Sequence, residues 1–204
     1  RAPTAGAMML YTIVEVEQQG LKDQLAKTCD NQPFIATAPY LLLFLADYQR
    51  WSDLYAAAGC EQRAAELGVA TRSPSEGDLI LALMDALIAA QTAVIAADSL
   101  GIGSCYIGDI MENCEVHRAM FDLPRYTLPV CLLCFGRPFA ARENPRLIKR
   151  FDHRFIVHRD RYHAVGPADF PELMRDAAGQ FPADGSGDSV KAYTQALYNR
   201  KFVS

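Results

Sequence analysis

The sequence has 204 residues, a formal net charge of −4, half of its residues apolar and 22% charged. This composition is typical of a soluble globular protein and argues against a disordered chain, a collagen-like chain or a nucleic-acid-binding tail. Six cysteines are too few for a small disulfide-stabilised secreted scaffold, and no basic-then-apolar leader opens the sequence. We therefore predict a cytoplasmic protein with reduced thiols that binds neither nucleic acid nor a membrane.

In the first half of the chain, predicted strands and helices alternate. Residues 10–16 are rich in β-branched side chains, and residues 40–46 form an apolar run without alternation, which predicts a strand covered on both faces. The expected elements are a strand at 10–16, a helix at 19–28, a short connection between Pro33 and Pro39, a strand at 40–46, and helical residues at 47–67 interrupted at Gly59.

The second half begins with a polar loop and a long apolar helix. The expected elements are a loop at 72–77, a helix capped by Asp78 and running to residue 99, a glycine-rich strand and turn at 101–108, a helix from Asn113 to near Phe121, strands at 128–135 and 155–158, a capping box at 169–172, a linker at 181–189 and a final helix from Val190. Together they predict a mixed α/β or α+β single domain.

Residues 79–100 are apolar enough to be considered as a membrane span. However, Asp85, Gln91, Thr92 and Asp98 interrupt this segment, and alanine is abundant in it. A charge at the centre of a spanning helix costs about 3 kcal/mol on insertion scales. A helix that is apolar on all sides is better explained as buried, inside a domain or between subunits.

No metal site is expected from the cysteines or the histidines. Cys131 and Cys134 have the spacing of a zinc or redox pair, but no second pair completes it, and residues three apart on a strand point to opposite faces. The odd spacing of His153, His158 and His163 likewise separates them along a strand. We interpret both cysteines as buried structural residues.

Positive charge is concentrated in residues 142–163, which hold seven lysines and arginines against three acidic residues. On an acidic protein, such a segment suits a small phosphate-bearing ligand, although a solvated surface explains it equally well. The glycines between Gly101 and Gly108 match neither a dinucleotide-binding nor a phosphate-loop spacing. Because no nucleophile motif or carboxylate pair is present, a cofactor would have to carry any chemistry.

Five segments together resemble the FMN-dependent nitroreductase family. Residues 1–8 (RAPTAGAM) look like its APTAGN-type flavin loop, and residues 89–103 resemble its central helix with the GLG turn. Residues 104–110 (SCYIGDI) are similar to its YIGG-like flavin turn. Residues 128–138 resemble its LP…GxP strand, and residues 149–151 its basic PR-type element.

This resemblance implies an α+β fold, with a mostly antiparallel sheet in a three-layer α/β/α sandwich. It implies a single domain over residues 1–204, in which residues 164–204 form a helical C-terminal extension. Members of the family are intertwined homodimers with FMN at the subunit interface, and the apolar helix at 79–99 would then belong to the dimer core. The family also has about 40 further residues before its flavin loop, so we expect the natural chain to extend beyond Arg1.

The resemblance also implies a set of flavin-binding residues. The loop would act mainly through its backbone, the turn would pass beside the flavin ring with an N–H near N5, and a glutamine would reach the ring edge. The expected residues are Pro3, Thr4, Ala5, Gly6, Gln32, Tyr106, Ile107, Gly108, Asp109, Lys149 and Arg150. Ala7 stands where the family has asparagine.

The implied activity is electron transfer from NADPH or NADH to a small acceptor, a nitroaromatic or a quinone, by a ping-pong mechanism. N5 of the flavin would carry the chemistry, so we expect no catalytic side chain and no metal. Two alternatives remain open from the sequence. One is a flavin-binding or storage protein without turnover, and the other is a dimeric scaffold whose pocket is degenerate.

Overall fold

The computed structural model describes residues 1–137, 150–173, 191–192, 194–196 and 198–199. The chain divides into two compact units, Arg1–Ala140 and Ala141–Ser204. Each unit is described below by itself. The expectation of one domain over the whole chain therefore stays a prediction.

The first unit is built on a four-stranded antiparallel sheet in the order β1-β2-β4-β3. The strands are β1 (Tyr11–Glu15), β2 (Tyr40–Asp47), β3 (Gly103–Ile107) and β4 (Thr127–Gly136). All four confirm strands predicted from the sequence. In the centre of the sheet, β2 is buried on both faces, as its uninterrupted apolar run predicts.

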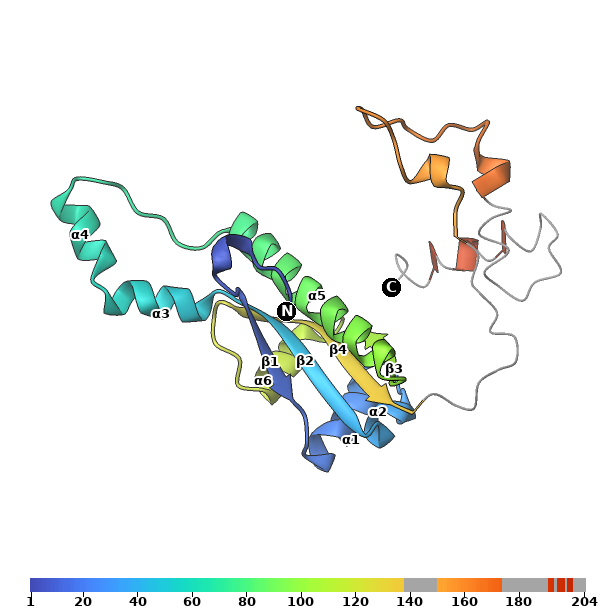
Figure 1. Cartoon of the computed structure of the whole chain (residues 1–204), viewed down its shortest axis with the longest axis horizontal. Helices are drawn as coiled ribbons and strands as arrows, with labels where there is room; N and C mark the ends of the chain where they lie inside the picture. The colour runs from blue at the N-terminus through green and yellow to red at the C-terminus, as the bar shows by residue number, and fades with distance from the viewer. Residues whose placement is uncertain (138–149, 174–190, 193, 197, 200–204) are drawn as a thin grey trace. The chain divides into compact units, whose positions relative to one another are not determined.

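Helices cover both faces of this sheet, which makes the three-layer α/β/α arrangement (Figure 1). On one face, Leu41, Leu43 and Leu45 of β2 pack with residues of α1 (Gln19–Thr28) and α2 (Pro33–Thr37). On the other face, Phe44 and Ala46 pack against α5 (Glu76–Ser99). The α+β fold class is thus confirmed.

The short helices have local causes. The predicted connection between Pro33 and Pro39 contains α2, because Pro33 occupies the first helical turn, where its missing N–H costs nothing. Gly59 has a φ of 67° and separates α3 (Gln49–Ala57) from α4 (Cys60–Glu66), which confirms the predicted interruption. The helix predicted from Asn113 is α6 (Cys114–Met120).

The start of α5 differs from the prediction. Ser75 is the N-cap, and Asp78 is the N3 residue of a capping box in which each side chain bonds the other residue's backbone. Asp78 also forms an ion pair with Arg72, which holds the pKa of its carboxyl group well below the ordinary range. Asp78 therefore stabilises the helix start from inside the first turn rather than from the cap position.

The two sides of α5 carry side chains of very different size. Its sheet-facing side holds small residues: Ala82, Asp85, Ala86, Ala89, Ala90 and Ala97 are buried. Its outer side, which we call the exposed face of α5, holds large apolar ones: Ile80, Leu81, Met84, Leu87, Ile88 and Ile95. By length and composition α5 could cross a membrane, and 28% of its most apolar window is buried within this chain.

In the second unit, the strand predicted at residues 155–158 is wrong. A 3-10 helix, η3 (His153–Phe155), occupies this position, and the Asp152 side chain accepts a hydrogen bond from the backbone N–H of Arg154. Arg154 also forms ion pairs with Asp169 and Glu172, at 3.4 and 2.6 Å. These polar contacts outweigh the strand preference of the short apolar run at residues 155–158.

Asp169 precedes helical residues at 170–173, as predicted. The contacts differ from those of a capping box, however: the Asp169 side chain accepts from the Gly166 N–H at 3.1 Å, and the Glu172 side chain pairs with Arg154. The predicted linker at 181–189 and Val190 lie outside the described residues. The described residues between 191 and 199 are helical.

Candidate functional site

The candidate flavin loop predicted at residues 1–8 overlaps a closed turn at residues 4–10. Side chains of α5 and α3 hold this turn in place. On α5, Asp85 accepts hydrogen bonds from Thr4, Ala5 and Leu10. From α3, the indole N–H of Trp51 donates to the Met8 carbonyl at 2.8 Å, and Arg50 donates to the Met9 carbonyl at 3.1 Å. These contacts fix the loop from both helices.

The loop contains three residues in the left-handed region. A 3-10 turn, η1 (Ala5–Ala7), has Gly6 at a φ of 54°, and Ala7 and Met9 follow at 58° and 51°. Glycine and asparagine tolerate this conformation better than other residues. The asparagine of the family motif therefore suits the backbone at position 7, where this chain has alanine.

Ala7→Gly is expected to raise the free energy of unfolding by about 0.5–1 kcal/mol, because glycine adopts a positive φ without the steric cost that alanine has. Urea denaturation of both proteins measures the difference. Ala65→Gly, at an exposed position inside α4, is the control. It should lower stability by about 1 kcal/mol. A fall in stability for both variants would contradict the strain assigned to Ala7.

The candidate flavin turn, residues 104–110, begins within β3 and leads into η2 (Asp109–Met111). Ile107 is buried and anchors the turn in the core, while Tyr106 and Gly108 are exposed. The Tyr106 hydroxyl donates to Gln91 Oε1 of α5 at 3.4 Å, and partial burial raises the pKa of that hydroxyl. A Cβ built on Gly108 would meet no atom within 4 Å, so the backbone there faces open space.

Gln32 and Asp109, both predicted site residues, are in direct contact. The Gln32 side-chain amide donates to Asp109 Oδ2 and to the Cys29 carbonyl, each at 2.9 Å. Gln32 therefore ties the start of α2 to the candidate flavin turn, a role that the sequence did not indicate.

His117 of α6, which the sequence did not single out, supports the same turn. Its ring is fully buried, and its Nδ1 and Nε2 atoms lie 2.7 Å from the Ile110 carbonyl and 2.8 Å from Thr28 Oγ1. Nothing in the local sequence around position 117 distinguishes it from a surface histidine.

Cys131 and Cys134 are free thiols that point to opposite faces of the sheet. Cys131 packs in the cluster against α5, and Cys134 packs in the cluster on the other face. Burial raises the pKa of each thiol to about 12. Both results confirm the interpretation of these residues as structural.

Among the described residues, no group of three or more His, Cys, Asp or Glu side chains could hold a metal ion. His158 and His163 are in contact. The His163 backbone N–H donates to His158 Nδ1 at 3.0 Å.

In the first unit, the candidate flavin loop precedes β1 and the candidate flavin turn lies at the end of β3, so the two belong to opposite edge strands of the sheet and share α5 as a neighbour. The flavin loop contacts α5 at Asp85, and the flavin turn contacts the same helix at Gln91. Six residues separate these positions, or about 9 Å along a helix at 1.5 Å per residue. Lys149 lies outside the described residues, and Arg150 belongs to the second unit. Their part in the site stays a prediction.

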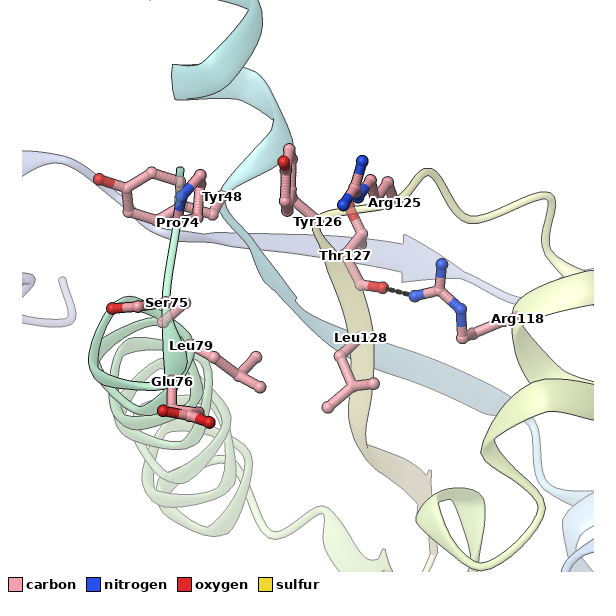
Figure 2. A pocket seen from close by; sticks show the side chains of 11 residues that line it. Tyr48, Pro74, Ser75, Glu76, Leu79, Arg118, Arg125, Tyr126, Thr127 and Leu128 are labelled. Carbon is pink, nitrogen blue, oxygen red and sulfur yellow. Dashed lines mark hydrogen bonds between the residues drawn. The ribbon is translucent and has the colours of Figure 1, made fainter. Parts of the chain in front are cut away.

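Two cavities of the first unit lie away from these residues. One, of about 440 Å³, lies between the start of α5 and the start of β4, where Leu79 and Leu128 extend toward each other (Figure 2). Arg118, which also lines it, donates to the Thr127 carbonyl. The second, of about 730 Å³, is lined mainly by apolar residues from the end of α5, β2 and β4. Neither is lined by a predicted flavin-binding residue.

Curated relatives resemble most of this chain. An oxygen-insensitive NADPH nitroreductase of Salmonella typhimurium is 31% identical over 154 residues, 76% of this chain and 58% of that protein. An NADPH-dependent oxidoreductase of Staphylococcus aureus is 29% identical over 176 residues, 84% of this chain and 65% of that protein. The chain thus spans about three-fifths of the length of these relatives.

Solved structures share the fold. Nitroreductase A of Vibrio parahaemolyticus has a TM-score of 0.77 at 23% identity, covering 96% of this chain and 76% of that one. An NADPH:FMN oxidoreductase of Vibrio harveyi, complexed with NAD+, has a TM-score of 0.75 at 20% identity with the same coverage. The sequence profile of the Nitroreductase family matches residues 1–137. With these three comparisons added to the loop, the turn and the antiparallel sheet, the chain belongs to the nitroreductase family.

Proposed function

We propose that this protein is an FMN-dependent oxidoreductase that takes electrons from NAD(P)H and passes them to a nitroaromatic, a quinone or a similar small acceptor by a ping-pong mechanism. The observation that carries the proposal is the placement of the loop at residues 4–10 and the turn at residues 106–109 along one helix. FMN, when bound, would supply the two-electron chemistry.

The described residues fit the flat ring of a flavin. The open space at Gly108 allows a ring to approach the backbone closely, and the exposed Tyr106 lies beside it. Gly6 exposes a second stretch of backbone in the loop. Backbone groups at these positions would donate hydrogen bonds to the ring, while Pro3, Thr4, Ala5 and Asp109 would shape the surface around it. The buried Ile107 side chain would hold the turn in place.

The phosphate of FMN needs a positive partner, and Lys149 and Arg150 are our proposal for it. Arg150 is exposed in the second unit. A guanidinium group binds phosphate in a bidentate manner, and a lysine adds a second positive charge. Both relatives quoted above are named for NADPH. NADPH is therefore the donor to test first.

The exposed face of α5 supports a homodimer. Six large apolar side chains on one side of a single helix form a surface that would otherwise remain in water. Burial of each such side chain contributes about 1.5–3 kcal/mol. We propose that two copies pack these faces together and that the flavin lies between them, which would explain why neither cavity of a single chain contains the predicted flavin residues.

Anaerobic addition of NADPH to the purified protein with FMN tests the reaction. Prompt bleaching of the flavin absorption bands, and their return on addition of a quinone or nitroaromatic, is the expected result. A bound flavin that neither NADPH nor NADH reduces would contradict the enzyme and favour a storage protein. No flavin binding at all would favour a scaffold with a degenerate pocket.

A further inference from the structure

Asp85 is a carboxyl group in the middle of the most apolar helix of the chain, and it is 2% exposed. Its neighbours on the sheet-facing side of α5 are alanines. Burying such a group costs several kcal/mol unless hydrogen bonds satisfy its oxygens. The hydrogen bonds that Asp85 accepts therefore explain how α5 can contain a buried carboxyl group.

Three of its hydrogen bonds come from one short segment. Oδ2 accepts from the Thr4 hydroxyl at 2.5 Å and from the Leu10 N–H at 3.1 Å, and Oδ1 accepts from the Ala5 N–H at 2.9 Å. The Thr4 hydroxyl in turn accepts from the Met9 N–H at 2.8 Å. One carboxyl group thus fixes both ends of the loop at residues 4–10.

The contacts from α3 cannot replace this carboxyl group. Trp51 and Arg50 hold the carbonyls of Met8 and Met9, near the end of the loop. The beginning of the loop, at Thr4 and Ala5, is fastened to Asp85. Loss of the carboxyl group would free the residues that are proposed to meet the flavin.

We propose that Asp85 is a positioning residue for the flavin. It holds the loop in the conformation that binds the ring, and it does so without touching the ring, because it is buried and its oxygens are engaged by the loop. This inference rests on the proposed FMN-dependent function.

The chemistry of the carboxyl group makes the proposal testable with an isosteric change. A carboxylate only accepts hydrogen bonds, whereas an amide presents an NH₂ group that cannot accept from the loop. Asp85→Asn would therefore leave at least one loop donor without an acceptor. We expect FMN to bind between about 5-fold and 150-fold more weakly, since this is the range for one unsatisfied buried group. Asp98→Asn, at an exposed position of the same helix, is the matched control and should bind FMN normally.

Thr4 provides a second test that does not depend on the folding of the Asp85 variant. Thr4→Val, which removes the hydroxyl, should lose more FMN affinity than Thr4→Ser, which keeps it. Fluorescence titration with FMN gives the dissociation constants. Hydrogen exchange at the Ala5 and Leu10 amides, measured without FMN, reports how firmly these two N–H groups are held in the loop.

Faster exchange at these amides together with weaker FMN binding in Asp85→Asn and Thr4→Val, with both effects smaller in Thr4→Ser, would support the proposal. Faster exchange with unchanged FMN affinity would overturn the positioning role and leave the proposed function intact. Failure of the unmodified protein to bind FMN would overturn both, while the exchange data would still show whether Asp85 fixes the loop.

Discussion

Leu87→Lys is expected to give a folded chain that no longer dimerises. Leu87 lies at the middle of α5 and is 45% exposed in a single chain. In a twofold dimer each substitution occurs twice, so removing two buried leucines and introducing two buried ammonium groups costs at least about 4 kcal/mol. The dissociation constant should therefore rise at least about a thousandfold.

Sedimentation velocity at micromolar concentration separates the two outcomes. The unmodified protein should sediment as a dimer and Leu87→Lys as a monomer with the same far-ultraviolet circular dichroism. Leu67→Lys, on a leucine that is 59% exposed just after α4, is the matched control and should remain dimeric. A dimeric Leu87→Lys protein would show that α5 is not the interface.

This substitution also tests where the flavin lies. If FMN sits between two subunits, Leu87→Lys should lose FMN binding together with the dimer, although Leu87 is not one of the predicted flavin contacts. A monomer that retains full FMN affinity would place the whole flavin site within one chain. The two effects, oligomeric state and affinity, are read on the same sample.

Much of the fold could be predicted because its signals are local. The strand at residues 40–46 and the helix at 19–28 follow from composition and periodicity, and the structure has them within one residue. The strand expected at 155–158 failed because a run of four residues is too short to outweigh the side-chain cap at Asp152 and the ion pairs of Arg154. The ion pairs join Arg154 to residues 15 and 18 positions away, so the local sequence carries no sign of them.

The candidate site was less predictable from the residues themselves. The loop and the turn were found through resemblance to a family, since neither matches a phosphate-binding spacing. Asp85 was read as an interruption in an apolar helix, and His117 was not considered. Each contacts its partners across at least seven residues of sequence. Only the tertiary structure shows that a lone carboxylate in α5 is the acceptor for a distant loop.

The packing of α5 on the sheet leads to the second large prediction, at Phe44. This residue is fully buried in β2 and contacts the cluster that contains Ala89, Ala90 and Cys131. Because the facing helix residues are alanines, the ring fills most of the space between helix and strand. The alanines of α5 are too small to fill the cavity that its removal would leave.

Phe44→Ala is therefore expected to lower the free energy of unfolding by about 3–5 kcal/mol. At roughly 2–4 °C per kcal/mol for a chain of this size, the melting temperature should fall by about 10 °C.

Phe34→Ala is the matched control, since Phe34 is 43% exposed on α2. It should cost about 1–1.5 kcal/mol, because nearly half of Phe34 stays in water in the folded protein. Thermal unfolding of both variants, at equal protein and FMN concentrations, keeps the contributions of binding constant. Equal losses would mean that the contact between α5 and β2 is not what stabilises the first unit.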